Sequence, residues 1–331
     1  MDEIKPIKKV FVTGSNGLLG SNLIEELLNL DYHVKGLVRN PATYVGFRHP
    51  HLELVKGSLF DDLRNSLKDC SFVIHVAAET SPDLLNYSDY QETNVKGTLN
   101  LLHAAIDQKL EKFIFVSTAN TIGYADDFNK GEEHQPMKSP YDQSFYALSK
   151  LEAEEKILQY SDRIDIIIAN PTFMLGSYDT KPSSGRIILM GLNNKIIFYP
   201  PGGKNFVNAK DAALGLVRCM ELGRNSEKYI LAGENLTYKE FFEKLSTMVG
   251  RKPIFIKIPK AVLVLFGLFG EILRNFRIKT SLSKANMLIV CINNFYSNDK
   301  SKKYLKIRYY PIEKGITEAI DFFKKNKKIK F

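Results

Sequence analysis

One feature near the start of the chain limits most strongly what it can fold into. It is an apolar stretch that is followed by a glycine-rich turn and then by an amphipathic segment. Residues 10–12 (VFV) predict a short buried strand. One helix face is predicted by leucines that recur every four residues, namely Leu19, Leu23 and Leu27. The connection between the two is TGSNGLLG, residues 13–20. A strand, a tight turn and a helix are therefore expected within the first 30 residues.

The three glycines of this turn have different expected tasks. Gly14 permits the tight turn, Gly17 lets the backbone approach a pyrophosphate at the positive end of the helix dipole, and Gly20 lets the helix pack against the strand. Their spacing is G-x-x-G-x-x-G, which differs from the G-x-G-x-x-G of the common dinucleotide fingerprint. We predict nucleotide binding, and the alternative is a glycine-rich turn that binds nothing.

Apolar runs alternate with helical patterns up to about residue 175, which predicts a doubly wound α/β fold with a parallel Rossmann sheet. We expect the dinucleotide-binding core over residues 1–175, with 205–232 returning to it. A smaller, mostly helical substrate-binding lobe is expected over residues 176–204 and 233–331. The chain has 331 residues, 44% of them hydrophobic and 25% charged, which is ordinary for globular proteins and long enough for such a lobe.

Cysteine and histidine usage excludes several classes of protein. Three scattered cysteines fit neither a disulfide framework nor a metal site, and six histidines contain no H-x-x-x-H pair. This cysteine and histidine pattern gives no reason to expect a bound metal. No charged-then-apolar leader precedes the first strand, so we expect a cytoplasmic protein. The net charge is +9, partly in a basic tail at residues 324–330. Nucleic-acid binding is not expected, because no basic recognition module is recognisable.

The apolar segment Ala261–Leu273 (AVLVLFGLFGEIL) raises the question of a membrane. It is shorter than the roughly 20 apolar residues that span a bilayer, and Glu271 interrupts it. We predict a buried helix of the smaller lobe. The alternative is an interfacial helix and a peripheral membrane contact.

The pattern Tyr-x-x-x-Lys occurs three times, beginning at Tyr146, Tyr296 and Tyr310. Tyr310 precedes a proline, which disfavours a helix there, and Tyr296 lies in a polar stretch that we expect outside the sheet core. Tyr146 and Lys150 fall on a clear helical pattern, where a spacing of four places both on one face. An ammonium there can lower the pKa of a phenol from about 10, so that the phenol exchanges a proton with a carbinol oxygen.

A second chemical group is expected where the fifth predicted strand ends, at Ser117 and Thr118. The ends of parallel strands deliver side chains to the ligand crevice. A hydroxyl there can bind the substrate oxygen beside Tyr146, and the alternative is ordinary β-branched strand packing.

With these motifs together, the chain resembles the extended short-chain dehydrogenases/reductases of the NAD(P)-dependent epimerase/dehydratase superfamily. The resemblance is carried by TGSNGLLG, HVAA, NVKGTLNLL, FVSTANTIG, YALSK, NPTFMLG and GGKNFVNAKD, which cover most of residues 8–215. Within the family the chain is most similar to the dihydroflavonol-reductase-like and steroid-dehydrogenase-like branch. The resemblance also implies a homodimer formed by core helices.

The resemblance implies roles for individual residues. Tyr146 is the implied proton donor or acceptor, Lys150 lowers its pKa and binds the nicotinamide ribose, and Thr118 stands at the catalytic serine position. The implied cofactor-binding residues are Gly14, Asn16, Gly17, Leu18, Leu19, Gly20, Arg39, Ser58, Leu59, Ala77, Ala78, Asn94, Tyr146, Lys150, Pro171 and Thr172. The hydride chemistry itself belongs to the nicotinamide.

Two departures from the family pattern bear on the cofactor. Ser58 replaces the aspartate that contacts adenine, and Asp61 could compensate only if its loop reorganised. At the end of the second strand stands Arg39, where NAD-binding members carry a carboxylate. A guanidinium suits the 2′-phosphate of NADP, with Arg48 as a second contact. We therefore expect NADP, with NAD possible, and the alternative is that Arg39 is a solvated surface residue.

The function we predict is NADP-dependent interconversion of a small-molecule carbonyl and a secondary alcohol. The main alternative is a nucleotide-sugar epimerase or dehydratase with retained NAD. Family dehydratases carry Asp-Glu after the catalytic threonine, whereas Ala119-Asn120 stand here. A non-catalytic NADP sensor is disfavoured because both Tyr146 and Lys150 are present. A membrane-associated sterol or lipid dehydrogenase stays open because of the segment Ala261–Leu273.

Overall fold

A seven-stranded parallel sheet forms the centre of the larger part of the molecule. The computed structural model describes residues 8–125 and 130–326. The strand order is β10-β6-β5-β4-β1-β2-β3. Its strands are β1 (Lys9–Thr13), β2 (His33–Val38), β3 (Leu52–Lys56), β4 (Phe72–His75), β5 (Lys112–Val116), β6 (Asp165–Pro171) and β10 (Lys228–Leu231). The order reverses between β1 and β4, which is the switch point where such sheets bind ligands.

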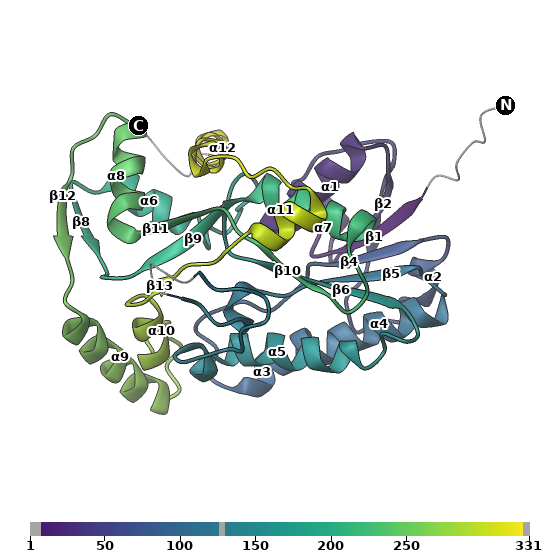
Figure 1. The fold of residues 1–331 in the computed structure, drawn as a ribbon, viewed down its shortest axis with the longest axis horizontal. Coiled ribbons are helices and arrows are strands. Elements are labelled where there is room, and N and C mark those ends of the chain that lie inside the picture. The colour runs from purple at the N-terminus through teal and green to yellow at the C-terminus, as the bar shows by residue number, and fades with distance from the viewer. Residues whose placement is uncertain (1–7, 126–129, 327–331) are drawn as a thin grey trace.

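Helices cover both faces of this sheet, as Figure 1 shows. One layer contains α1 (Leu18–Asn29), α7 (Ala209–Leu222) and α11 (Asp299–Leu305). The other contains α2 (Arg64–Leu67), α3 (Tyr87–Gln91), α4 (Thr98–Asp107) and α5 (Phe145–Leu158). Alternate strand residues serve the two layers: Val10 and Val12 pack in one buried cluster and Phe11 in the other. The predicted doubly wound Rossmann fold is confirmed.

Short helical turns shape the connections at the carboxyl edge of the sheet. They are η1 (Pro41–Thr43), the π-helical η2 (Glu92–Gly97), η3 (Ala119–Thr121) and η4 (Tyr141–Gln143). Helices α4 (Thr98–Asp107) and α5 (Phe145–Leu158) therefore begin close to irregular segments, η2 and η4, which bring polar side chains to the crevice.

The second lobe is built on strands as well as on helices. Its strands are β7 (Phe173–Leu175), β8 (Ile196–Tyr199), β9 (Gly203–Asn208), β11 (Glu234–Thr237), β12 (Ile254–Lys257) and β13 (Asn293–Asn294). Within this lobe, β7, β9, β11 and β13 form a four-stranded mixed sheet, and β8 and β12 form a separate pair of strands. Its helices are α6 (Arg186–Asn193), α8 (Tyr238–Met248), α9 (Lys260–Asn275), α10 (Lys284–Ile289) and α12 (Ile312–Lys325). Phe206 and Phe241 stack with ring centroids 4.5 Å apart in its core.

The chain returns from this lobe to the main sheet twice. The predicted return of the late strand is confirmed, because β10 pairs in parallel with β6. A second return was not predicted: Leu305 and Ile307 pack in the same buried cluster as Val10 and Val12. In the domain division that we propose, residues 299–307 therefore join the core, although the sequence pattern placed them in the lobe.

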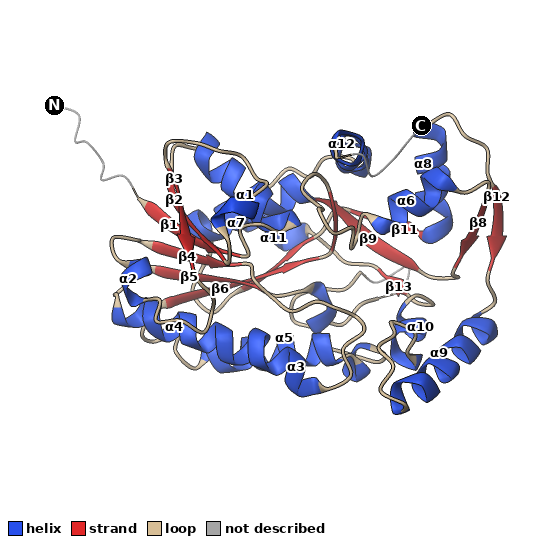
Figure 2. Cartoon of the chain, turned by 180° about the vertical axis from the view of Figure 1, so that it is seen from behind, coloured by secondary structure: helices blue, strands red, loops and turns tan. Residues whose placement is uncertain are grey.

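The predicted burial of Ala261–Leu273 is wrong. In α9 the buried residues are Leu263, Gly267 and Gly270, and most of its large apolar side chains are exposed. Two glycines are the physical reason, since they bring the helix backbone against residues 282–284 and leave no room for larger side chains on that face. Figure 2 shows α9 and the β8–β12 pair at the end of the molecule opposite β1–β3. In the part of the chain that the structure describes, every helix is either too short or not apolar enough to span a bilayer.

Candidate active site

The glycine-rich turn lies directly against the end of β4. Gly14 has a φ of +67°, and a Cβ there would lie 2.7 Å from the amide nitrogen of Ala77. A Cβ on Gly20 would lie 2.1 Å from the carbonyl oxygen of Gly14. Gly17 is the N-cap of α1 and supplies no side chain to its first amide groups, which include those of Leu18 and Leu19. This geometry suits an anion at the helix N-terminus.

Asn16 holds the loop that follows β2. Its side chain donates to the carbonyl of Thr43 at 2.9 Å and accepts from the amide of Val45 at 3.0 Å. Arg39, which comes directly after β2, is exposed at the base of this loop. Arg48 lies 5.1 Å from the ring centroid of Tyr44. Asn16 thus positions the turn and the arginine-bearing loop relative to each other, a role that its sequence motif did not indicate.

The turn after β3 already contains a carboxylate. Asp61 Oδ2 accepts a hydrogen bond from the Ser58 amide at 2.8 Å. Ser58 Oγ in turn accepts from the amide of Phe60 at 3.3 Å, and Leu59 is buried against Gly97. A tight turn over residues 58–61 thus folds the Asp61 carboxylate back onto Ser58, and the expectation that Asp61 contacts adenine only after a reorganisation of this loop stays a prediction.

Asn94 connects the segment after β4 to α5. Its side chain accepts from the Glu79 amide at 2.7 Å and donates to the Glu79 carbonyl at 3.0 Å and to Ser149 Oγ at 2.9 Å. Ala77 and Ala78, half-buried, stand just before Glu79. Asn94 itself lies in the π-helical turn η2, a deformation that is frequent at functional sites. Its amide is therefore used within the protein, where it fixes the segment that carries both alanines.

Tyr146 and Thr118 meet at the carboxyl end of β5. Ser144 caps α5 by accepting from the Ala147 amide, which places Tyr146 in the first turn. The Thr118 side chain beside the phenol lowers the pKa of Tyr146, but burial has the larger effect and raises that pKa to about 12. The phenol is thus held protonated beside a second hydroxyl.

Lys150 lies one helical turn further along α5 and is 1% exposed. Its Nζ has no hydrogen-bond partner among the described residues and sits 3.9 Å from the ring centroid of Phe115. Burial lowers the pKa of Lys150 to about 7, although the Glu154 carboxylate opposes that shift. A buried amine without acceptors is unfavourable. The hydroxyls of a nicotinamide ribose would supply those acceptors, so Lys150 fits the cofactor that the glycine-rich turn suggests.

A buried carboxylate behind Lys150 was missed by the sequence analysis. Glu154 is fully buried and receives hydrogen bonds from four side chains, those of Ser117, Thr121, Asn170 and Lys228. Because Ser117 donates to Glu154, Thr118 is the hydroxyl of this strand end that faces Tyr146. The spacing of four between Lys150 and Glu154 was the available signal, since it places both on one helix face.

The placement predicted for Tyr296 is also wrong. Tyr296 is 3% exposed and donates a hydrogen bond to the Ala119 carbonyl at 3.0 Å, directly beside Thr118. Isolated β-bridges of Phe295 to Ala125 and of Tyr296 to Gly131 hold this polar stretch against the segment that follows β5. Tyr310 is exposed.

A cavity of about 420 Å³ opens beside Tyr146. Its lining comes from both parts of the molecule, including Thr80, Tyr90, Asn120, Tyr146, Arg274 and Ile289. At the end of β6, Pro171 is buried, and the Thr172 hydroxyl donates to Asn205 Oδ1 at 2.7 Å. The cavity thus joins Tyr146 to the second lobe, where substrate selectivity is expected to reside.

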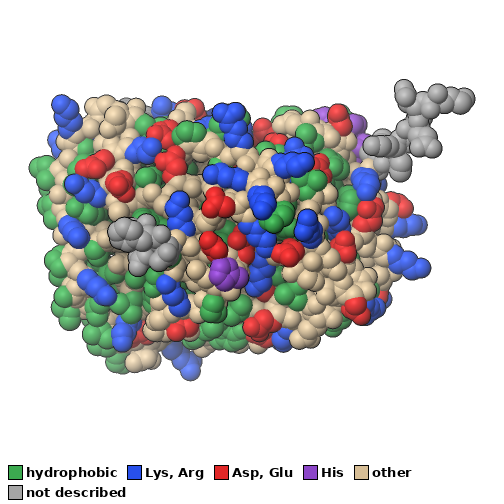
Figure 3. All heavy atoms as spheres, viewed as in Figure 1, with side chains coloured by type: hydrophobic (Ala, Val, Ile, Leu, Met, Phe, Trp, Pro, Cys, Tyr) green, Lys and Arg blue, Asp and Glu red, His purple; other side chains and the backbone are tan. Residues whose placement is uncertain are grey.

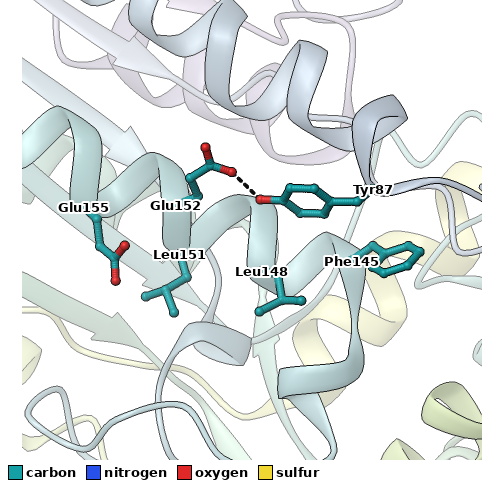
Figure 4. Close-up of a pocket in the computed structure, with 6 residues that line it drawn as sticks. All are labelled: Tyr87, Phe145, Leu148, Leu151, Glu152 and Glu155. Atoms are coloured by element: carbon teal, nitrogen blue, oxygen red, sulfur yellow. Dashed lines mark hydrogen bonds between the residues drawn. The ribbon is translucent and has the colours of Figure 1, made fainter.

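A second hollow, of about 300 Å³, lies on the other side of α5. Figure 4 shows the residues that line it, namely Tyr87, Phe145, Leu148, Leu151, Glu152 and Glu155. The Tyr87 hydroxyl donates to Glu152 across its rim. None of the candidate catalytic side chains is in this lining, although Phe145 borders both this hollow and the cavity beside Tyr146.

The Rossmann sheet and this site define an NAD(P)-dependent oxidoreductase of the extended short-chain type. The chain belongs to the NAD dependent epimerase/dehydratase family, which matches residues 10–232. Its relatives include a Synechocystis sp. protein named "Putative dihydroflavonol 4-reductase", 27% identical over 97% of this chain and 96% of that protein. The sterol-4-alpha-carboxylate 3-dehydrogenase (decarboxylating) of Dictyostelium discoideum is 28% identical over 92% of this chain and 96% of that protein.

Solved structures agree with the fold. The crystal structure of gox2253 superposes with a TM-score of 0.85 at 30% identity, covering 98% of this chain and all of that chain (100%). MoeE5 in complex with UDP-glucose and NAD superposes with a TM-score of 0.75 at 19% identity, covering 96% and 99%. The second likeness concerns the fold alone, and the family and fold expected from the motifs are confirmed.

Proposed function

We propose that the protein is an NADP-dependent reductase or dehydrogenase that interconverts a carbonyl and a secondary alcohol, with Tyr146 as the acid/base group. The observation that carries the proposal is the Tyr146–Thr118 pair beside a cavity, with the unpartnered amine of Lys150 one turn away. The nicotinamide supplies the hydride. Tyr146 donates the proton to the carbonyl oxygen, Thr118 aligns that oxygen, and Lys150 holds the ribose.

The proposed preference for NADP rests on Arg39, and replacing it by aspartate is expected to reverse it. The exposed guanidinium after β2 can form charge-assisted hydrogen bonds to a 2′-phosphate, whereas a carboxylate repels that group and accepts from a 2′-hydroxyl. We expect Arg39→Asp to weaken NADP binding about 10–100-fold, which is the size of one or two such bonds. Titration of NADP and NAD into both proteins measures the change.

Arg163→Asp is the matched control for charge, because Arg163 is also exposed but precedes β6, at the amino edge of the sheet. Both affinities should stay as in the wild type in this variant. Equal binding of the two cofactors by the wild type, or the same preference in Arg39→Asp, contradicts the assignment.

The epimerase alternative differs in the fate of the cofactor. A reductase releases its oxidised cofactor in every turnover, whereas an epimerase regenerates and can retain it. We expect the purified protein to lose its nucleotide on extensive dialysis and to bind NADP with a micromolar Kd, of order −8 kcal/mol. It should then consume NADPH stoichiometrically with a carbonyl compound. Tightly retained NAD without net redox change would favour the epimerase and overturn this proposal.

Two further parts of the proposal concern assembly and location. A homodimer through core helices stays a prediction, and the apolar hollow along the outer side of α5 is the surface we propose for it (Figure 4). Sedimentation of Leu148→Asp against the wild type checks this.

A reducing, cytoplasmic location is in keeping with the free thiols of Cys70, Cys219 and Cys291.

A further inference from the structure

The outward face of α9 is apolar, the reverse of an ordinary surface helix. Its exposed large side chains recur at spacings of one to four residues and have exposed fractions of 38–75%: Val262, Leu265, Phe266, Leu268, Phe269, Ile272 and Phe276. Exposed apolar patches of this extent mark sites of interaction with proteins or membranes.

The inward face of α9 explains why this orientation is fixed. A Cβ on Gly270 would lie 1.6 Å from the Leu282 carbonyl oxygen, and one on Gly267 would lie 2.9 Å from Lys284 Cα. The glycine face therefore has to point towards the protein, because only it allows the backbones to approach. The large apolar side chains of α9 do not fit on that inward face, and they therefore lie on the outward face.

The apolar surface continues onto the pair of strands β8 and β12, of which β12 comes directly before α9 in the sequence. Ile254 and Ile256 of β12 and Ile196 and Phe198 of the paired β8 are all exposed. In Figure 3, hydrophobic side chains gather at the left and lower-left edge, where Figure 1 places β8, β12 and α9. We call the exposed apolar residues of β8, β12 and α9 the apical patch.

The charges around the apical patch are almost all positive. Residues 251–290 contain one acidic residue, Glu271, whose Oε1 accepts from the Lys284 amide at 3.0 Å. The same stretch contains eight basic residues: Arg251, Lys252, Lys257, Lys260, Arg274, Arg277, Lys279 and Lys284. Of these, Lys257, Lys260, Arg277 and Lys279 are exposed beside the apolar side chains.

We propose that the apical patch docks on an anionic lipid bilayer, with α9 lying in the interface. Apolar side chains flanked by lysine and arginine match the acyl boundary and the acidic headgroups at the same time. A second copy of the chain fits less well, because a two-fold interface would bring the same positive charges face to face.

The opposite flank of α9 reaches the candidate active site. Arg274 and Asn275 line the cavity that contains Tyr146, and Arg274 donates to the Leu84 carbonyl at 2.7 Å across that cavity. Docking would therefore hold the cavity close to the bilayer. Resting on the proposed function, we infer that the substrate is a lipid-soluble carbonyl or alcohol that partitions into the membrane.

Flotation with vesicles of phosphatidylglycerol and phosphatidylcholine in equal parts tests the docking without any substrate. The wild type should float, and more weakly with phosphatidylcholine alone. The triple variant Leu265→Ser, Phe266→Ser, Phe269→Ser should partition about 100-fold less, because three large apolar side chains no longer enter the bilayer. The matched control Leu30→Ser, Leu222→Ser changes exposed leucines of the Rossmann core and should float like the wild type.

Each outcome decides one of the two ideas. Absence of flotation, flotation of the triple variant at the wild-type level, or a patch-dependent dimer that does not bind vesicles would overturn the docking. NADPH oxidation with a water-soluble ketone tests the proposed reductase separately and should be the same in both variants. If docking holds, vesicle-dissolved ketones should be reduced more slowly by the triple variant alone. Equal rates would overturn the inferred substrate class and leave the reductase intact.

Discussion

Replacing Tyr146 by phenylalanine is expected to lower turnover about 10²–10⁴-fold, the usual size of a general acid/base contribution. The change removes one hydroxyl, which lies beside Thr118 and next to the cavity. Because burial raises the pKa of Tyr146 to about 12, the phenol is protonated at neutral pH, as reduction of a carbonyl requires. NADP affinity should change little, since Lys150 and the glycine-rich turn are untouched. Steady-state turnover and cofactor titration measure the two quantities.

Tyr310→Phe is the appropriate control for this variant. Tyr310 is exposed and begins the same Tyr-x-x-x-Lys pattern, so loss of its hydroxyl should be almost silent. Tyr296 is unsuitable, because its hydroxyl donates to the Ala119 carbonyl next to Thr118. Wild-type turnover in Tyr146→Phe would remove Tyr146 from the reaction.

The features that the sequence predicts well are those that local periodicity encodes. The strand at residues 10–12, the leucine face of α1 and the helix that carries Tyr146 depend on contacts near in sequence or on burial from both sides. Gly14 could be read from its motif because a positive φ and a close backbone approach tolerate no Cβ.

The features that were missed depend on contacts between distant segments. Nothing local to Tyr296 indicates that Ala119, 177 positions earlier, accepts its hydrogen bond. The apolar residues of α9 look like core residues, but glycines on the opposite face take the buried position. A hydrophobic pattern predicts a helix and its apolar face, and only the packing partners decide whether that face points inwards.

Glu154→Ala is expected to lower the free energy of unfolding by about 3–5 kcal/mol, because it breaks a buried charged network by removing one partner. The fully buried carboxylate accepts from four side chains, and its loss leaves Ser117, Thr121 and Asn170 without that acceptor. Glu154→Gln keeps the shape and one acceptor oxygen, so it should cost less, about 1–2 kcal/mol. Urea unfolding measures both changes. Glu155→Ala, at the next and exposed position, should stay within about 0.5 kcal/mol of the wild type.

Glu154→Gln should also shift the pH dependence of cofactor binding. The carboxylate raises the pKa of Lys150, while burial lowers it to about 7, so its removal lowers that pKa further. If ribose hydroxyls favour the charged amine, the wild-type affinity for the cofactor weakens as the pH rises through about 7. In the variant, the same weakening with rising pH should begin at a lower pH than in the wild type. Comparing both proteins at each pH cancels the titration of the cofactor's own phosphate. Identical profiles, with Glu154→Ala as stable as Glu155→Ala, would mean that the buried network neither stabilises the fold nor acts on Lys150. A shifted profile in a stable Glu154→Gln protein would assign Glu154 to the positioning of the catalytic amine.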